Sequence, residues 1–376
     1  MAMHDRGSVV VPEYDGRCLN QLIRSAGAAT AGHVNPLELP AVPRYVVVLI
    51  DGLGHDLLAD NADCAPYLSS MRESTLTCGL PSTTVTSLTS LGTGLAPGTH
   101  GVVGYTSRIP GTTRTLNALK WSDDVDPLEW QPHPTVLESI AADGTAATVV
   151  NSAKFEGTGL TLCSQRGVPY HGVANVWERL DATVEAAEVA PRSLVYTYES
   201  TLDHIGHKYG CTSAKWRERL REVDADLRQL REAMPPDAAL VVTADHGMVD
   251  LPFEDRFDVE NARELLDDVL VFAGEARFRQ IYTRTGATDE VARRWREFCG
   301  ERAVVVTRDE AEQRGWFGPI DDRVRPRIGD VLVASLGEFA VFSSRWFGVE
   351  LKMVGFHGSL TATEMTVPLL VDAPTT

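Results

Sequence analysis

Two short apolar runs in this chain each end in an acidic residue close to a glycine. Residues 45–50 lead into Asp51, and residues 239–243 lead into Asp245 and His246. Runs of this length, rich in β-branched residues, predict buried strands of a parallel sheet. Strands that end in ligand-type residues present those side chains at the carboxyl edge of the sheet, where α/β proteins bind their ligands.

The rest of the first 250 residues alternates strand-like and helix-like segments. A short helical pattern and a proline-rich segment precede the first strand. Alternation on this scale predicts an α/β fold, with a mostly parallel central sheet and helices on both faces. The predicted strands are 45–50, 146–150, 194–198 and 239–243, and the predicted helices are 84–92, 134–142, 176–189 and 213–233.

Residues 251–345 change character and are predicted to form a small inserted cap, called the cap below. A candidate ligand, His357, returns after this segment, so the whole chain (1–376) is predicted to be a single catalytic domain wrapped around the insertion. Within the cap, strands are expected at 269–272 and 303–306, and helices at 288–299 and 308–314.

Composition narrows the class of protein. A hydrophobic content of 43% in 376 residues suits a full-sized core, and no run approaches the ~18 apolar residues that span a bilayer. The formal charge of −17 argues against nucleic acid or an anionic membrane as partner. No apolar segment follows the first six residues, and the six cysteines are scattered without a CxxC pair. Both features predict a cytoplasmic protein without a secretory signal; the oligomeric state is left open.

Further candidate metal ligands lie outside the two strand ends. Asp203 and His207 are spaced i, i+4 in a helical pattern, so both side chains point the same way and can reach one ion. Each feature alone also fits a turn, a solvated helix face or a loop histidine. Together they give three aspartates and three histidines, the right count for two divalent metals. The candidate ligands are Asp51, Asp203, His207, Asp245, His246 and His357.

A hydroxyl-rich segment supplies a candidate nucleophile. Pro81 is followed by Ser82, Thr83 and Thr84, and proline before small hydroxyl residues predicts a helix start. Most of these hydroxyls are expected to be caps or helix-face groups. A hydroxyl held at a helix N-terminus beside a metal has a lowered pKa, and the backbone N–H groups there face an incoming phosphate. We assign the role of nucleophile to Thr84.

In order and local spacing, these motifs resemble the alkaline phosphatase superfamily, and within it the nucleotide pyrophosphatase/phosphodiesterase branch. The resemblance implies two zinc ions, one held by Asp203, His207 and His357. The other would be held by Asp51, Asp245 and His246 and would touch Thr84. The matching segments are Asp51-Gly, Pro81-Ser-Thr-Thr84, Thr93-Gly-Leu-Ala-Pro-Gly-Thr-His-Gly101, Asp203-x-x-Gly-His207-x-x-Gly210, Asp245-His-Gly247 and His357-Gly.

The resemblance further implies a hydrolase that cleaves phosphodiester or pyrophosphate bonds of a small, nucleotide-type substrate through a phospho-threonine intermediate. Manganese is the alternative metal, because mixed Asp/His sites accept both. The chain departs from the branch at Thr83, where a lysine is usual, and at residues 86–87, where Pro-Asn is usual. The asparagine that binds a phosphate oxygen in the branch falls on Tyr105 by counting, and Asn117 is a substitute; both are candidate substrate-binding residues.

Two kinds of alternative remain open. One is a phosphomonoesterase or phosphonate hydrolase on the same scaffold, and the other is a metal-binding homologue that has lost catalysis. A diester is expected over a monoester, because the third charged oxygen of a monoester needs a further cation. The first lysine or arginine after Thr84 is Arg108. Lys154 or the arginines of residues 322–327 could supply the cation if they fold over the site.

Overall fold

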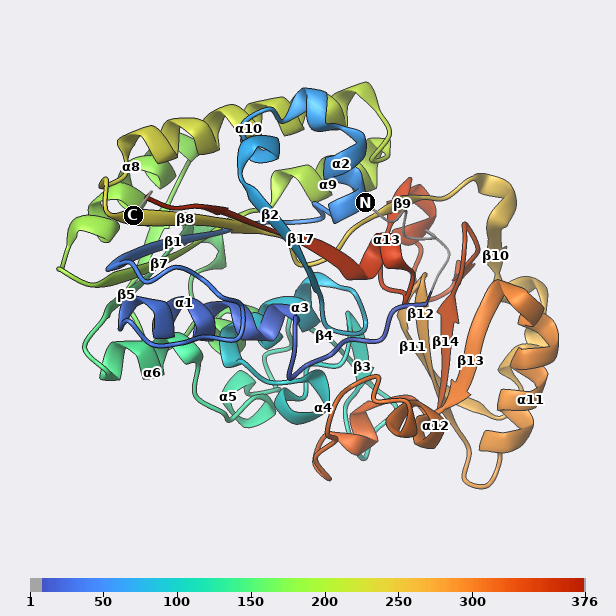
Figure 1. The fold of residues 1–376 in the computed structure, drawn as a ribbon. Helices are drawn as coiled ribbons and strands as arrows, with labels where there is room; N and C mark the ends of the chain where they lie inside the picture. Colours follow the sequence, from blue (N-terminus) through green and yellow to red (C-terminus); the bar gives the residue numbers. More distant parts are fainter. Residues whose placement is uncertain (1–8, 375–376) are drawn as a thin grey trace.

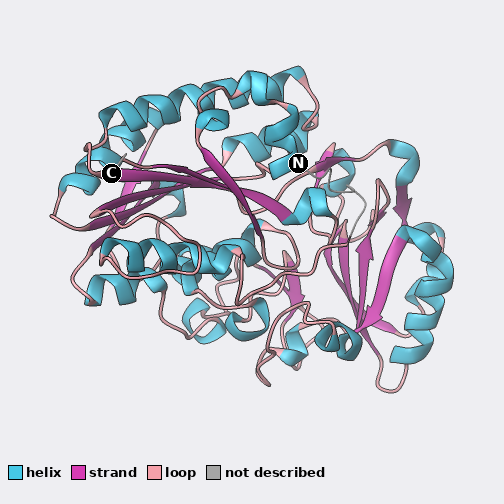
Figure 2. Cartoon of the chain, in the orientation of Figure 1, coloured by secondary structure: helices cyan, strands magenta, loops and turns pink. Residues whose placement is uncertain are grey.

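A computed structural model describes residues 9–374 of the chain (Figure 1). It has a central sheet with helices on both faces and a smaller sheet beside it (Figure 2). The prediction of an absent secretory signal rests on residues 1–6, which lie outside the described residues. Within residues 9–374, no helix is long and apolar enough to cross a membrane.

The seven-stranded central sheet confirms the predicted α/β class. Five neighbouring strands run parallel in the order β8-β1-β7-β5-β6, and β17 pairs antiparallel with β8 and with the edge strand β2. All residues of β7 and β8 are buried, as expected of parallel strands covered on both faces. The strands are β1 (Arg44–Ile50), β2 (Arg72–Thr77), β5 (Ala146–Ser152), β6 (Tyr170–Val173), β7 (Ser193–Glu199), β8 (Ala238–Thr243) and β17 (Thr366–Asp372).

Helices cover both faces of this sheet, and the predicted helices near 84, 134, 176 and 213 are present as α3, α6, α8 and α10 (Figure 1). One layer contains α2 (His55–Asp60), α8 (Val176–Glu188), α9 (Thr201–Tyr209) and α10 (Ala214–Ala233). The other contains α1 (Leu22–Thr30), α3 (Thr84–Thr93), α4 (Pro97–His100), α5 (Pro127–Trp130), α6 (Val136–Ala142) and α7 (Gly159–Ser164).

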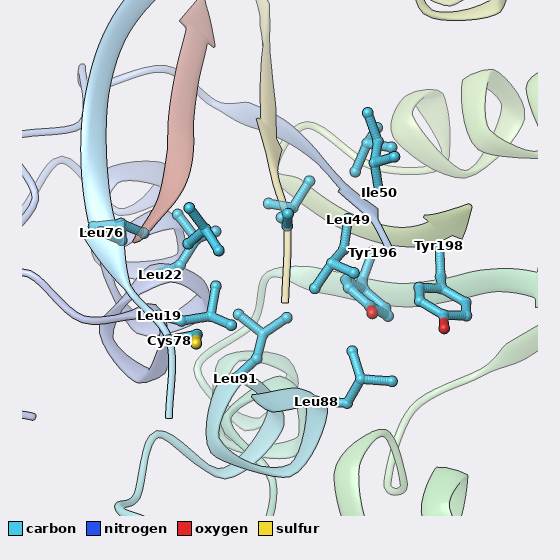
Figure 3. Packing of buried hydrophobic residues seen from close by; sticks show 14 of the residues in the cluster. Leu19, Leu22, Leu49, Ile50, Leu76, Cys78, Leu88, Leu91, Tyr196 and Tyr198 are labelled. Carbon is cyan, nitrogen blue, oxygen red and sulfur yellow. The ribbon is translucent and has the colours of Figure 1, made fainter. Parts of the chain in front are cut away.

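Helix α3 is buried along its whole length. Figure 3 shows Leu88 and Leu91 of α3 in the apolar cluster that also contains Leu49 of β1 and Tyr196 of β7. On its other side α3 packs closely on α7, where a Cβ at Gly92 would lie 1.8 Å from the Ser164 carbonyl oxygen. Packing on both sides fixes the position of the N-terminus of α3, which is where the candidate nucleophile lies.

The cap contains an antiparallel sheet of four strands in the order β11-β12-β14-β13. Strands β11 (Val269–Glu275) and β13 (Ala303–Thr307) and helices α11 (Thr288–Cys299) and α12 (Arg308–Gln313) lie where they were predicted. Strands β12 (Phe278–Thr283) and β14 (Val331–Ser335) were not predicted. Phe278 and Trp316 of the cap belong to the main apolar core. The bounds of the cap and the single-domain organisation stay predictions.

Short pairs of strands connect these parts. The hairpin β3 (Thr106–Arg108) and β4 (Thr115–Asn117) follows α4, and β10 (Arg256–Asp258) pairs with β15 (Ala340–Phe342) at the border of the cap. β9 (Val249–Asp250), just after β8, pairs with β16 (Gly355–Phe356), which leads into His357. Helix α13 (Ala362–Met365) then precedes β17.

Candidate active site

The predicted ligands meet at the carboxyl edge of three adjacent strands. Asp51 follows β1, and Asp245 and His246 lie beyond the end of its neighbour β8. On the other side of β1, strand β7 leads into α9, which carries Asp203 and His207. The pairing of β16 with β9 brings His357 to the same edge. Local strand order and one late return of the chain therefore assemble six ligands that are dispersed in the sequence.

The first group consists of Asp203, His207 and His357, whose ligand atoms all lie within 4.8 Å of one another. His207 Nε2 is 3.3 Å from Asp203 Oδ2 and 3.3 Å from His357 Nε2. The i, i+4 spacing on α9 places the first two side chains on one side of the helix, as predicted.

The second group consists of Asp51, Asp245 and His246, with ligand atoms again within 4.8 Å of one another. His246 Nε2 lies 3.4 Å from Asp51 Oδ1 and 3.7 Å from Asp245 Oδ2. Asp245 and His246 are completely buried, and Asp51 is 4% exposed. The structure thus brings together the same two sets of three that the family resemblance implied.

The three histidines share one orientation. Each Nδ1 lies within 2.9 Å of a backbone carbonyl oxygen, which fixes Nδ1–H as the donor: His207 to Gly355, His246 to Gly247 and His357 to Ser82. The Nε2 atoms are left as lone-pair donors that face the carboxylates. The Nε2 atoms of His207 and His357 are only 3.3 Å apart, and a cation between them would stabilise this arrangement of two lone pairs.

The two groups adjoin, and Thr84 lies at their junction. The rings of His246 and His357 stack with centroids 3.6 Å apart. Thr84, the first residue of α3, places its Oγ1 3.2 Å from His246 Nε2. The side chain of the N-cap residue Thr83 makes no capping hydrogen bond, so the N-terminal N–H groups of α3 are not occupied by that side chain. This is the hydroxyl-at-helix-start arrangement that the sequence predicted.

Negative charge accumulates in the second group. Burial, with repulsion from Asp245 and Asp203, raises the pKa of Asp51 well above its usual range. Burial also raises the pKa of Asp245, although His246 opposes the shift. The pKa of His357 is lowered well below its usual range by burial and by the neighbouring histidines His246 and His207. Two acids that resist ionisation beside a histidine that resists protonation indicate a site built around a positive charge supplied from outside.

Unpartnered oxygens give an independent test of whether divalent metals fit. Among the described residues, Asp51 Oδ1, Asp203 Oδ1 and Asp245 Oδ2 are buried without any hydrogen-bond partner. A buried carboxylate oxygen without a partner is costly unless a cation binds it. Each group of three therefore fits one metal ion, with mixed oxygen and nitrogen ligands of the kind that zinc and manganese accept.

Two residues that support Asp51 and Asp245 were not identified from the sequence. The hydroxyl of Tyr198, near the end of β7, donates a hydrogen bond to Asp51 Oδ2. The N–H of Gly52 donates to Asp245 Oδ1 at 3.1 Å, from a backbone with φ of +74°, which glycine adopts without strain. The Asp-Gly dipeptide was a visible signal for the second contact, whereas one tyrosine in an apolar strand gives no signal for the first.

The candidate substrate-binding residues Tyr105 and Asn117 lie together on the β3–β4 hairpin. The N–H of Ala118 donates to the Tyr105 carbonyl oxygen at 3.0 Å. Asn117 Oδ1 accepts from the N–H groups of Leu119 and Lys120, at 3.0 and 3.1 Å, so this oxygen stabilises its own turn. Burial raises the pKa of Tyr105, and a hydrogen bond with Asn117 opposes that rise. A role for either residue in binding substrate stays a prediction.

The sheet, the paired Asp/His groups and the hydroxyl at a helix start define the class of this protein, a phosphoric ester hydrolase of the alkaline phosphatase superfamily. Its sequence matches the type I phosphodiesterase / nucleotide pyrophosphatase family over residues 45–360, and the chain belongs to that family.

Solved structures show the same fold. An inactive threonine-to-alanine variant of murine ectonucleotide pyrophosphatase / phosphodiesterase 5 in complex with AMP superposes with a TM-score of 0.70, at 17% identity over 88% of both chains. Phosphonoacetate hydrolase from Sinorhizobium meliloti 1021, in complex with phosphonoformate, superposes with a TM-score of 0.65, at 22% identity over 88% of this chain and 89% of that one. At these identities the similarity establishes the fold alone.

One relative shares a short segment of higher identity. GPI ethanolamine phosphate transferase 3 from Eremothecium gossypii is 45% identical over 47 residues, which is 12% of this chain and 5% of the transferase. The match therefore spans only a small part of the curated relative.

Proposed function

We propose that this chain is a metal-dependent hydrolase of phosphodiester or pyrophosphate bonds in a small, nucleotide-type substrate, with Thr84 as nucleophile. The observation that carries the proposal is the position of Thr84 Oγ1, 3.2 Å from His246 Nε2 at the junction of the two ligand groups. Family membership supports the reaction class. The AMP complex of an inactive threonine-to-alanine variant, in a protein of the same fold, supports both a threonine nucleophile and a nucleotide-type ligand.

The residues present fit two divalent metals, and we propose zinc. Asp203, His207 and His357 would hold one ion, and Asp51, Asp245 and His246 the other. Two such ions would lower the pKa of a nearby hydroxyl and neutralise charge that develops on a phosphate in the transition state.

The chain's own groups define the rest of the reaction. Thr84 Oγ loses its proton to solvent water and attacks phosphorus, and the bond from phosphorus to the leaving-group oxygen breaks, with its electron pair going to that oxygen. Water then attacks phosphorus and breaks its bond to Thr84 Oγ, which releases the phosphomonoester that keeps the substrate's second ester group and restores the threonine hydroxyl. The N-terminal N–H groups of the ten-residue helix α3 provide backbone donors and a positive dipole end for the phosphate oxygens.

Replacement of Thr84 by alanine tests the nucleophile. We expect Thr84→Ala to bind metal as the wild type does and to lose turnover of nitrophenyl diesters by several orders of magnitude, because the hydroxyl that forms the covalent intermediate is then missing. Thr83→Ala is the matched control, since Thr83 precedes the helix and should leave turnover largely intact. Near-normal kcat in Thr84→Ala, with loss in Thr83→Ala, would reassign the nucleophile and contradict the proposal.

A phosphonate hydrolase is the second candidate, and one observation favours it. A pocket of about 200 Å³ opens at the ends of β5 and β7 and contains Lys154. The Lys154 ammonium lies 4.6 Å from the Phe155 ring centroid, and within residues 9–374 it forms no ion pair. By contrast, the arginines of this pocket, Arg179 and Arg219, both form ion pairs with Glu199, and Arg219 also pairs with Glu222. A free cation here would suit an anionic leaving group, such as the carboxylate of the phosphonoacetate bound by a protein of the same fold.

A direct comparison of substrates distinguishes the two candidate functions, phosphodiesterase and phosphonate hydrolase. We expect kcat/KM to be higher for a nitrophenyl diester than for either a matched monoester or phosphonoacetate. A preference of about tenfold or more for phosphonoacetate, roughly 1.4 kcal/mol of transition-state binding, would establish the second candidate instead. In that case Lys154→Met should remove the preference and leave metal content unchanged.

We also propose that the protein works in the cytoplasm. All six cysteines are free and buried in the structure, which suits a reducing compartment. Fractionation of the producing cells with an antibody to the chain tests this location, and recovery outside the cytoplasm would refute it.

A further inference from the structure

Four carboxylates in the described part of the chain have a buried oxygen with no hydrogen-bond partner. Three of them are the candidate metal ligands Asp51, Asp203 and Asp245, and the fourth is Glu275. An unpartnered buried carboxylate oxygen lowers stability, so its presence needs a compensating role. For the three aspartates a metal supplies that role, whereas no predicted site residue accounts for Glu275.

Glu275 enters the site from the cap. It is the last residue of β11 and pairs with Phe278 across a tight hairpin turn to β12. Its unpartnered oxygen is Oε1. Its other oxygen, Oε2, lies 3.9 Å from His357 Nδ1, beyond hydrogen-bond distance, on the side of the imidazole opposite the Nε2 that faces Asp203 and His207. The Glu275 side chain also packs on Gly358, the residue after His357: a Cβ at Gly358 would lie 2.8 Å from Glu275 Cδ.

Two other buried acids, from segments that pack on this hairpin, each pair with one of its arginines. Glu364 forms a buried ion pair with Arg277 at 2.6 Å, and Glu350 forms one with Arg279. Glu275 has neither arginine as an ion-pair partner within residues 9–374. It is 8% exposed, so water gives it little compensation. Its closest basic group is therefore the His357 imidazole.

We propose that Glu275 is a positioning residue for the metal ligand His357, through which the cap hairpin strengthens metal binding by the Asp203–His207–His357 group. The Ser82 carbonyl already accepts the Nδ1–H of His357, so Glu275 acts on the ring through its negative charge, which stabilises the imidazole when its Nε2 binds a cation. This role rests on the proposed two-metal function. It explains why the chain keeps an acid in a buried position where, among the described residues, no arginine or lysine lies within ion-pair distance.

The decisive variant is Glu275→Met, which is similar in volume and needs no hydrogen-bond partner. Glu275 has no arginine as an ion-pair partner within residues 9–374, so its removal should leave the metal-free protein about as stable as the wild type, while affinity for one of two zinc ions falls about tenfold or more. The measurements are zinc competition against a chromophoric chelator and thermal melting of the metal-free protein. Glu275→Gln removes the same charge and serves instead if the methionine variant does not fold.

Glu350→Gln is the matched control, because it removes a buried carboxyl charge of the same cluster whose partner is Arg279. We expect the opposite pattern from it: a lower melting temperature of the metal-free protein and unchanged zinc affinity. Equal zinc affinities in the wild type and Glu275→Met, or equal losses in Glu275→Met and Glu350→Gln, would overturn the assignment of Glu275 alone. A wild-type protein that takes up no divalent metal would overturn the proposed function together with it.

Discussion

Asp51 shows how much a single side chain of this site depends on its neighbours. Its Oδ1 faces His246 Nε2 at 3.4 Å without a hydrogen-bond donor of its own, and its Oδ2 accepts from the Tyr198 hydroxyl. The tyrosine thus fixes one oxygen and leaves the other directed at the metal group. A second-layer contact of this kind sets ligand geometry without touching substrate.

Tyr198→Phe tests that contact. We expect a fall of about tenfold in metal affinity or activity with little change in folding stability, because the ring that packs in the core is retained. Tyr196→Phe is the matched control, two residues earlier on the same strand and drawn beside Tyr198 in Figure 3. Its hydroxyl is buried without a partner, so its removal should leave metal binding unchanged. Equal effects of the two substitutions, measured by zinc titration, would contradict a specific role for Tyr198.

Among single residues, the sequence predicted those that combine a ligand-type side chain with a recognisable place at a strand end or in a helical spacing. Asp51, Asp245 and His246 could be predicted because each follows an apolar strand, and Asp203 and His207 because their spacing matches a helical turn. Tyr198 and Glu275 could not, because one lies inside a buried strand and the other in a hairpin whose packing against His357 depends on the tertiary fold. The identity of a supporting residue is set by contacts between segments far apart in sequence.

At the scale of elements, strand β7 carries a second buried network close to the site. Glu199 at its end pairs with Arg179 of α8 at 2.7 Å and with Arg219 of α10 at 3.1 Å. It also accepts from the N–H of Thr201 at the start of α9. Burial alone would raise the pKa of Glu199, but the two arginines lower it to about 2. One carboxylate therefore connects the strand to three helices, including the helix that carries Asp203.

Glu199→Gln is expected to destabilise the fold by about 3 kcal/mol, the cost of leaving buried arginines without their partner. The pKa of Glu199 is lower in the folded state than in the unfolded chain. The stabilisation that its ion pairs provide is therefore complete above about pH 4.5 and is lost as the pH falls toward about 2. Urea unfolding of both proteins across this range should therefore converge at low pH. Glu232→Gln, which breaks the exposed pair with Arg228, should change little at any pH.

The elements that could be predicted are those with strong local patterns. β1, β5, β7 and β8 are apolar runs, and α8 and α10 have long periodic faces. Strand β2 is a partly exposed edge strand with polar residues, and β12 buries Arg279 and Gln280, so neither has the apolar signature of a strand. Their strand conformation is stabilised by pairing with β17 and β14, which no local pattern encodes.

At the scale of the whole molecule, the site closes only when the chain returns after the cap. His357 is held by the Ser82 carbonyl from the segment before α3, and Ser82 Oγ in turn donates to the Ser359 carbonyl at 2.7 Å. Ser359 Oγ donates to Ser335 of cap strand β14 at 2.5 Å. The loop after β16 therefore joins three parts of the chain: the segment of the proposed nucleophile, the candidate metal ligands and the cap. For this reason the sequence showed the cap only as an interruption before the late candidate ligand His357.

Removal of metal should consequently lower the stability of the whole chain. A ligand at about 100 times its Kd stabilises a fold by about 2.7 kcal/mol, and two ions here would act on segments from residue 51 to residue 357.

In the metal-free fold the pKa values of Asp51 and Asp245 are raised, so the folded state binds more protons than the unfolded chain and loses stability as pH rises. Metal replaces those protons, and its stabilising effect therefore increases with pH. We expect the drop in melting temperature caused by a chelator to be larger at about pH 8 than at about pH 6. Replacement of His357 by alanine should reduce that drop at both pH values, because one ligand group is then incomplete. A chelator effect that is absent, or that shrinks as pH rises, would contradict a metal centre built on these carboxylates.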